Sequence, residues 1–317
     1  MDVENDKRGL SPVWLVVVAV LLWSTGGLFI KLTSLDAYQV TFFRSLLAAI
    51  TVLIITWRNG LRINAFGVLA TLIYSTLLFL FVWATKHTTA ANAIFLQYTA
   101  PIYILILAPF VIGEKFHLRD LATVIFCIAG MSLFFVGDLS LGDYQGNISA
   151  LGSGIFLGLY IMLLRHPRAT GNPKSSPPYE GGVAAASADG VVLSSKPINP
   201  VITVIYGNFL LAIVTLPSGI AAIPTITLKD ILAVGFLGVF QIGISYILFI
   251  KGVREGTRPL DASIIGFIEP LLNPVWVFLI IGERPSNWAV LGGTIIVATV
   301  VLHTLNQYRI QTRTDSG

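Results

Sequence analysis

The chain has 317 residues, of which 55% are hydrophobic and only 11% are charged. An ordinary soluble chain carries about a quarter charged residues, so this composition excludes a typical water-soluble fold. The net charge of +4 does not indicate nucleic-acid binding, because the basic residues are scattered between hydrophobic stretches, as they are in membrane proteins.

Apolar runs of about twenty residues recur along the whole chain, and a run of that length spans the roughly 30 Å hydrocarbon core of a bilayer. The runs lack the alternation of barrel strands, and a backbone in lipid must satisfy its own hydrogen bonds, so each run is predicted to be helical. The sequence therefore predicts an all-α integral membrane protein with ten transmembrane helices. These are expected at 13–30, 40–57, 66–84, 91–112, 121–136, 148–164, 200–221, 231–250, 262–281 and 289–305.

The ten spans are expected to form two repeats of five helices. The segment 166–199, which follows the sixth span, is rich in Pro, Gly, Ser and Ala and is predicted to be a flexible linker between the repeats. Most Lys and Arg residues fall on the side of the N-terminus, so the positive-inside rule predicts that both termini and the linker are cytoplasmic. The expected organisation is an N-terminal segment at 1–12, a first repeat at 13–165, the linker at 166–199, a second repeat at 200–306 and a C-terminal segment at 307–317.

An internal repeat supports this division. Shifting the sequence by 169 residues places 92–115 on 261–284, which brings Pro101 onto Pro270 and a Gly-Glu-basic sequence onto another. Five spans per repeat is an odd number, so the second repeat must enter the membrane from the opposite side, as in transporters with inverted repeats. Each proline lies about 18 Å inside its span, near the midplane, where it is expected to kink the helix and free a carbonyl. A kink that serves packing alone is the alternative.

Several sequence elements resemble those of one known family. They are Leu22-Trp23-Ser24, Phe43-Arg44-Ser45-Leu46-Leu47-Ala48, Gly113-Glu114-Lys115, Ile268-Glu269-Pro270 and Gly282-Glu283-Arg284-Pro285. Together they resemble the drug/metabolite transporter superfamily, in particular its ten-helix branch with paired EamA domains. The resemblance implies a secondary transporter, often an exporter, of amino acids or related metabolites in the cytoplasmic membrane. Two departures are the Ala100-Pro101 pair, which aligns with Glu269-Pro270, and the long linker.

Two charged residues lie well within predicted spans, where a charge costs about 2.5 to 3.5 kcal/mol. Glu269 is expected near the midplane and is a candidate proton-coupling residue; the alternative is a protonated carboxyl that hydrogen-bonds a neighbouring helix. Arg44 is expected four residues into its span, from where its long side chain can reach the outer interface or donate to loose backbone carbonyls. A direct pair between Arg44 and Glu269 is not expected, because their depths differ.

Polar and aromatic residues near the midplane are candidates for a substrate cavity, since such a cavity needs a few hydrogen-bonding groups among apolar walls. Packing is the alternative for each of them. The candidates are Trp23, Ser24, Tyr74, Gln97, Tyr98, Gln241, Tyr246, Phe267 and Asn273, with Asn92 and Tyr160 as further polar positions.

The sequence contains no phosphate-binding glycine loop and no His-Glu-x-x-His pattern, so neither ATP, a metal nor another cofactor is predicted. The expected partners are a small-molecule solute and the lipid bilayer, and a homodimer is left open. The favoured interpretation is a non-enzymatic carrier that works by alternating access. The rivals are an intramembrane lipid-modifying enzyme and a non-transporting scaffold or receptor.

Overall fold

The computed structural model describes residues 11–133, 143–166, 200–281 and 287–315. Nearly all of the predicted linker at 166–199 and most of the N-terminal segment therefore lie outside the described residues. Within these ranges the chain forms helices and no strands, which confirms the all-α prediction. Six helices there are long and apolar enough to cross a membrane, and a bent pair counts as a seventh.

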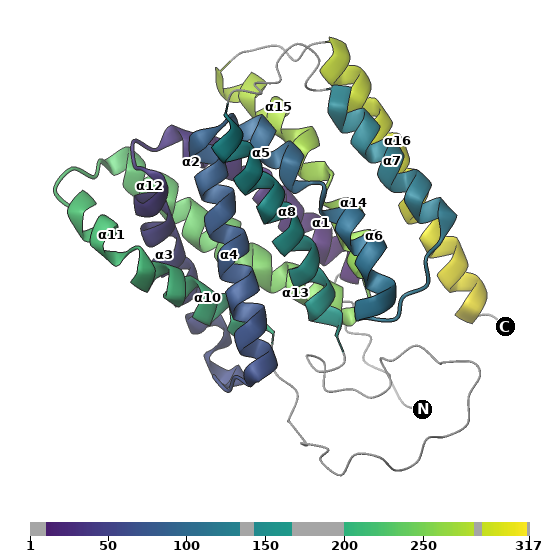
Figure 1. Ribbon diagram of the computed structural model, residues 1–317, viewed down its shortest axis with the longest axis horizontal. Helices are drawn as coiled ribbons and strands as arrows, with labels where there is room; N and C mark the ends of the chain where they lie inside the picture. Colours follow the sequence, from purple (N-terminus) through teal and green to yellow (C-terminus); the bar gives the residue numbers. More distant parts are fainter. Residues whose placement is uncertain (1–10, 134–142, 167–199, 282–286, 316–317) are drawn as a thin grey trace, which may run out of the picture.

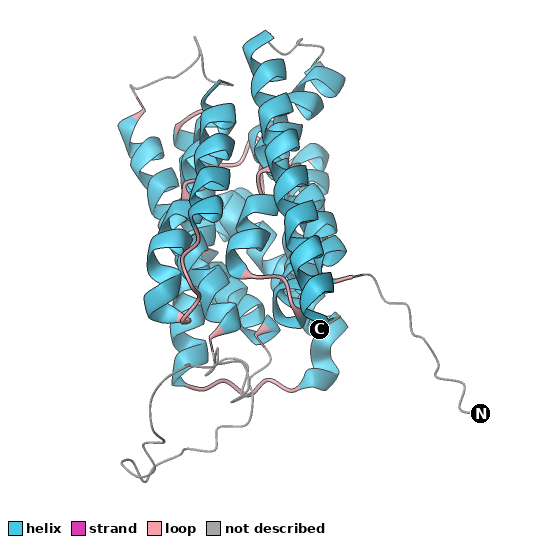
Figure 2. Ribbon diagram, turned by 90° about the vertical axis from the view of Figure 1, so that its right-hand side faces the viewer, coloured by secondary structure: helices cyan, strands magenta, loops and turns pink. Residues whose placement is uncertain are grey.

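In the described ranges, each of the ten expected spans holds one helix or a helix interrupted by a short break. The helices are α1 (Pro12–Trp23), α2 (Gly26–Leu32), α3 (Ala37–Thr56), η1 (Trp57–Asn59), α4 (Ala65–His87), α5 (Ala90–Gln97), α6 (Ala100–Val111), α7 (Leu118–Ser132), α8 (Tyr144–Arg165), α10 (Val201–Val214), α11 (Leu216–Ala222), α12 (Leu228–Phe236), the π-helix η4 (Leu237–Ile244), α13 (Ser245–Glu255), α14 (Pro259–Ile265), α15 (Ile268–Ile281) and α16 (Asn287–Asp315). Most run along one common direction (Figure 2).

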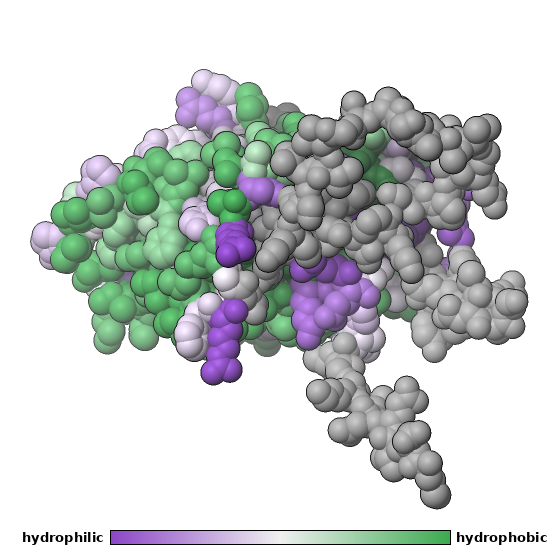
Figure 3. All heavy atoms as spheres, turned by 90° about the horizontal axis from the view of Figure 1, so that it is seen from below, coloured by the Kyte–Doolittle hydropathy of each residue, from purple (hydrophilic) through white to green (hydrophobic). Residues whose placement is uncertain are grey.

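The outer surface of the bundle is apolar. Phe110 exposes 85% of its surface and Ile54 67%, exposures that would be costly in water over so many large side chains. Seen from below Figure 1, hydrophobic side chains cover the described flank and hydrophilic ones collect near the middle (Figure 3). This distribution fits a protein whose flanks face lipid and whose ends face water.

Local sequence explains where the helices begin and break. Asp36 caps α3 by accepting a 2.9 Å hydrogen bond from the backbone N–H of Gln39, whose side chain in turn accepts from the N–H of Asp36. The span expected at 200–221 is broken: α10 and α11 meet at 66°, just before Pro217, which lacks the N–H that a continuous helix needs.

Two further boundaries differ from expectation. The first span is interrupted at Ser24 and Thr25, whose hydroxyls donate to backbone carbonyls one turn back. The last helix continues to Asp315 rather than ending near 305, because no Gly or Pro follows that would stop it.

The two halves are inverted relative to each other. In Figure 1, α5 leads down into α6, whereas α14 leads up into α15. Both pairs are interrupted just before the repeated proline, α6 starting at Ala100 and α15 at Ile268. Tyr98 and Phe267, which the 169-residue offset makes equivalent, stack with ring centroids 5.5 Å apart. Equivalent residues in mutual contact mark the axis that relates the halves.

Helices of one half also pack against helices of the other half. Five spans per half make α8 the first span of the second half, so the boundary between the halves lies before α8 and not at the predicted linker. Helix α4 packs along α8, and α13 packs along α1, so the first span of each half lies against the third span of the other. Helices α7 and α16, the last spans of the two halves, pair with each other at one edge of the bundle (Figure 1). This interleaving surrounds the crossing of α5–α6 and α14–α15 with helices from both halves.

Candidate functional site

A small polar cavity lies at this crossing, and we call it the central cavity. Its volume is about 30 Å³, enough for about two water molecules and too small for an organic solute. None of its lining residues exposes more than 7% of its surface. The lining residues are Trp23, Arg44, Leu77, Leu78, Phe81, Gln97, Tyr98, Leu157, Gln241, Ile242, Tyr246 and Glu269.

The interrupted spans of the two halves meet in one hydrogen bond at the cavity wall. Tyr98, which ends α5, donates from its hydroxyl to Oε2 of Glu269 at 2.7 Å. Glu269 lies in the first turn of α15, where the helix dipole favours a negative charge. A carboxylate within the bilayer is thus held at a helix start and by one phenol from the opposite half.

Arg44 corrects the expectation from the sequence. Its side chain is completely buried and lines the central cavity, so it does not reach for the outer interface. The reason is that α3 begins at Ala37 rather than at residue 40, which puts Arg44 roughly 10 Å inside the helix. Its Nη2 lies 3.4 Å from the carbonyl oxygen of Leu78, a long contact. Its Nε and Nη1 are buried with no hydrogen-bond partner among the described residues.

Gln241 brings a second unsatisfied group to the cavity. It lies in the π-helix η4, and its Oε1 is buried without a hydrogen-bond partner in the described part of the chain. π-Helical turns are rare and occur mostly at functional sites. The side chain lies over Gly26, where an added Cβ would come 2.7 Å from Nε2 of Gln241. Any residue larger than glycine at position 26 would push the side chain of Gln241 out of this position.

Aromatic rings pack against the cavity. Trp23 stacks on Tyr246 with centroids 4.8 Å apart, and its Nε1 donates to the hydroxyl of Ser245 at 2.7 Å. Tyr74 contacts Tyr246 edge-on at 4.9 Å and accepts a 3.0 Å hydrogen bond from Asn208. These rings come from spans of both halves, so a movement of one half against the other changes the shape of the cavity.

Most of the predicted cavity residues gather at the site. Trp23, Gln97, Tyr98, Gln241, Tyr246 and Glu269 line the central cavity. Tyr74 and Phe267 lie behind it, and the ring of each contacts the ring of a lining tyrosine. Ser24 is instead bonded to Trp276, whose Nε1 donates to its hydroxyl at 3.0 Å. The side chain of Asn273 lies outside the described residues.

Arg44 is the lining residue whose role the sequence misplaced, although a signal was present. Along α3, Thr41, Arg44, Ser45 and Ala48 are buried and recur at the three- and four-residue spacing of one helix face. Small and polar residues on that face indicate close contact with other helices rather than with lipid.

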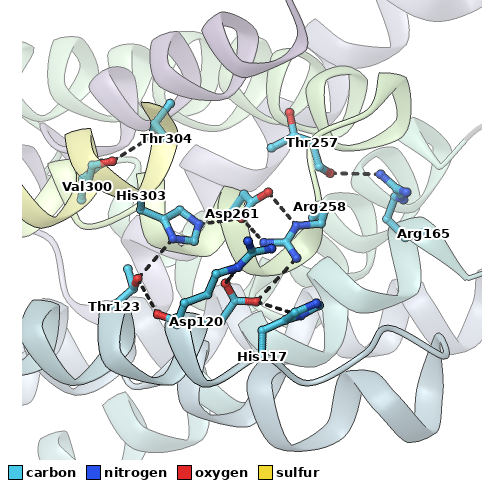
Figure 4. A network of polar contacts seen from close by, with 11 residues as sticks. His117, Asp120, Thr123, Arg165, Thr257, Arg258, Asp261, Val300, His303 and Thr304 are labelled. Atoms are coloured by element: carbon cyan, nitrogen blue, oxygen red, sulfur yellow. Dashed lines mark hydrogen bonds and ion pairs between the residues drawn. The ribbon is translucent and has the colours of Figure 1, made fainter. Parts of the chain in front are cut away.

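Polar contacts close the molecule on one side of the cavity, which we call the Arg258 end (Figure 4). Arg258 donates from Nε and Nη2 to the two carboxylate oxygens of Asp261, at 2.9 and 2.7 Å. Its Nη1 lies 3.5 Å from Asp120, and Nε2 of His303 lies 2.8 Å from Asp261. Burial lowers the pKa of Arg258, but Asp261 and Asp120 outweigh this and raise it above its ordinary value. These contacts tie α14 to α7 and α16.

The same end carries a simpler contact, formed by Arg165 at the end of α8. Its Nη1 donates to the carbonyl oxygen of Thr257 at 3.3 Å and to that of Val253 at 3.4 Å. The opposite side of the cavity, the Lys31 end, repeats this arrangement. There Lys31 Nζ donates to the carbonyl oxygen of Thr88 at 2.8 Å, and Thr88 is the residue that the 169-residue offset places on Thr257.

Two more contacts close the Lys31 end. Lys86 Nζ donates to the carbonyl oxygen of Thr33 at 3.1 Å. Asp230 accepts from the backbone N–H and the hydroxyl of Ser34, both at 2.8 Å. The central cavity therefore lies between two sets of polar contacts, one toward each face of the bundle.

Comparison with known proteins agrees with this architecture. The model of the EamA-like transporter family matches residues 10–136 and 182–305, so one copy covers each half. The chain belongs to the EamA-like transporter family. This confirms the resemblance drawn from the sequence and identifies a multi-pass membrane protein of a transporter family.

Relatives of this EamA-like protein carry transporter names. An uncharacterized transporter of Archaeoglobus fulgidus is 25% identical over 96% of this chain and all of its own length. Another, YxxF of Bacillus subtilis, is 23% identical over 94% of this chain and 91% of its own. Human solute carrier family 35 member G1 is 25% identical over about half of each chain. A crystal structure that is 18% identical has the same fold, with a TM-score of 0.69 over 94% of this chain and 98% of its own.

Proposed function

We propose that this EamA-like protein is a secondary transporter that moves amino acids or related small organic metabolites by alternating access, with export as its direction. The observation that carries the proposal is the central cavity: a polar, nearly solvent-free space at the crossing of two interrupted helices, with polar contacts toward both faces. Substrate sites of inverted-repeat transporters lie at such crossings of discontinuous helices.

The closed form supports an alternating mechanism. The cavity is too small for a metabolite, so a solute enters only after one end has opened. Opening the Arg258 end requires contacts of Arg165 and Arg258 to break, and opening the Lys31 end requires those of Lys31, Lys86 and Asp230 to break. Each set is small enough for a bound solute or an ion gradient to shift the balance between them by a few kcal/mol.

We assign the Arg258 end to the cytoplasm and the protein to the plasma membrane. The basic residues Arg119, Arg165, Arg254 and Arg258 gather at or near this end, and the positive-inside rule places such an excess on the cytoplasmic side. With this orientation, both termini are cytoplasmic.

Glu269 is the proposed coupling residue. Its carboxyl is buried, lines the central cavity and accepts a hydrogen bond from Tyr98. Gain of a proton there removes a buried charge, and loss of that proton restores it, so the proton and the solute can compete for the same small space. Proton release toward one face then accompanies movement of the solute toward the other.

Flux through proteoliposomes tests the proposal. Vesicles loaded with the twenty common amino acids should lose some of them faster when they contain the protein, and a pH gradient should change the rate. Glu269→Gln should abolish the dependence on the gradient, whereas Glu255→Gln should retain it, because Glu255 is 48% exposed and pairs with Lys251 at 3.9 Å, away from the central cavity. Unchanged pH dependence in Glu269→Gln would exclude Glu269 as the coupling site. If no amino acid or related metabolite moved, the carrier function itself would be overturned.

A further inference from the structure

We propose that Arg44 binds the carboxylate of the transported solute and that Gln241 and Glu269 receive its ammonium group, which makes zwitterionic α-amino acids the substrate class. This inference rests on the transport function proposed above and adds a binding role for a residue that the sequence assigned to the membrane interface.

The first step of the argument is the cost of Arg44 as it stands. A guanidinium carries five N–H donors, and Arg44 places all of them away from water with one long contact, 3.4 Å to the carbonyl oxygen of Leu78. Nε and Nη1 have no partner within the described chain. Leaving a buried charged donor unpaired is costly. A buried arginine with unpaired donors at this position therefore indicates a ligand that binds and dissociates.

The second step is geometry. The two unpaired nitrogens, Nε and Nη1, belong to a group that lines the central cavity. A guanidinium binds a carboxylate through two parallel hydrogen bonds, either from Nε with Nη2 or from Nη1 with Nη2. Nη2 has a second N–H besides the one near the carbonyl oxygen of Leu78, so both of these pairs can receive a carboxylate. The cavity walls beside Arg44 include Leu77, Leu78 and Phe81, so an anion bound there is shielded from water and strongly held.

The third step is the complementary chemistry in the same cavity. Gln241 lines the cavity, and its Oε1 is buried without a hydrogen-bond donor among the described residues. Glu269 adds a carboxylate there, and no ion pair joins it to Arg44 in the described chain. The cavity thus offers one unpaired cation, one unpaired acceptor and one carboxylate. A molecule with a carboxylate and an ammonium a few ångströms apart satisfies all three.

Three other polar lining residues already have hydrogen-bond partners, which makes them poorer candidates for binding the solute. Gln97 donates from Nε2 to the hydroxyl of Ser153 at 2.7 Å, and Trp23 donates to Ser245. Tyr98 donates to Glu269. The unpaired groups are therefore concentrated on α3 and η4, which touch each other closely at Gly238, where an added Cβ would lie 2.8 Å from the carbonyl oxygen of Arg44.

Ligand analogues test the inference on the unaltered protein. The full chain in lipid nanodiscs is challenged with three panels: the twenty amino acids, their carboxamides, which lack the carboxylate, and the matching 2-hydroxy acids, which lack the ammonium. Thermal unfolding reports binding, because a ligand that binds only the folded state raises Tm. We expect some amino acids to raise Tm and their carboxamides to bind roughly tenfold to hundredfold more weakly. The hydroxy acids should fall between.

Variants then assign the carboxylate site to Arg44. Arg44→Gln should lose the preference for amino acids over carboxamides, and Arg44→Lys, which keeps the charge without the fork, should keep part of it. Arg58→Gln is the matched control, because Arg58 lies exposed just after the same helix. If Arg44→Gln fails to fold, Arg44→Lys and the analogue panels carry the test alone.

The possible results separate this inference from the transport function. Carboxamides that bind and move as well as amino acids would overturn the role of Arg44 and leave the carrier standing. Retained preference in Arg44→Gln, with affinity changed less than twofold, would also overturn it. Flux of none of the three panels would instead overturn the proposed transport of amino acids, and with it this inference.

Discussion

The two ends of the molecule are built from equivalent positions but are not equally strong. At both ends a cation that closes the first span of a half donates to the carbonyl of the equivalent threonine, Lys31 to Thr88 and Arg165 to Thr257. The Arg258 end adds a network of Arg258, carboxylates and a histidine that the Lys31 end lacks within the described residues. An inverted repeat produces two similar ends. The additional side chains at the Arg258 end therefore determine which end is closed more firmly.

This difference has a mechanical meaning. If the ends open alternately, the end with more contacts is the one that costs more to open. We therefore expect the resting protein to open more readily at the Lys31 end. Equivalent buried alanines, Ala93 in α5 and Ala262 in α14, are 0% and 1% exposed, so cysteines placed there report opening of the two ends in the same way.

The largest effect is expected from Arg258→Gln. It removes the cation that Asp120 and Asp261 share and leaves them the contacts with Arg119 and His303. Breaking such a pair costs about 2 to 4 kcal/mol at this partly exposed site. In a Cys127→Ala background, alkylation of Ala262→Cys by a maleimide should rise more than tenfold. Arg258→Lys should show a smaller rise, since it keeps the charge. A rise confined to Ala93→Cys would show that the network does not hold this end closed.

A matched pair of substitutions gives the next largest effect. Lys31→Gln and Arg165→Gln each remove the cation from a threonine carbonyl, and each should cost about 1 to 2 kcal/mol. Lys31→Gln should increase labelling of Ala93→Cys, and Arg165→Gln should increase labelling of Ala262→Cys, each roughly fivefold or more. The prediction fails if both variants raise labelling at the same end.

The smallest effect distinguishes the two threonines themselves. The hydroxyl of Thr88 accepts a 3.2 Å hydrogen bond from Asn92, whereas the buried hydroxyl of Thr257 has no partner in the described chain. Thr88→Val should lower the free energy of unfolding by about 1 kcal/mol, and Thr257→Val should leave it unchanged or raise it slightly. Thermal unfolding of the two variants side by side decides this. Equal losses would mean that the equivalent turns are satisfied alike.

Much of the architecture was predictable because the bilayer restricts the choices. An apolar run of about twenty residues in lipid can only be a helix, and an odd number of spans per repeat forces inversion. The repeated prolines Pro101 and Pro270 correctly marked the two interruptions, because a proline withholds an N–H wherever it occurs. Tyr98 and Glu269 were expected near the midplane for another reason: one is a polar aromatic residue and the other a charged residue within a predicted span.

Other features depended on neighbours that are far away along the chain. Arg44 was placed too near the interface because its depth depends on the cap at Asp36, and its direction depends on which helices α3 packs against. Ser24 was expected to line the cavity, but Trp276 reaches it from a helix more than 250 residues later. The network around Arg258 joins three separate helices, and its members looked like scattered residues near span ends in the sequence.

The sequence by itself therefore determined that the chain lies in a lipid bilayer, that it is helical, that its repeats are inverted and where its helices break. These features follow from hydropathy, hydrogen bonding and proline positions along single segments. Only the tertiary structure decided which polar groups share a cavity, which of them lack partners and how each end is closed. Those properties depend on the rotation of each helix about its axis and on contacts between distant segments, and local sequence constrains neither strongly.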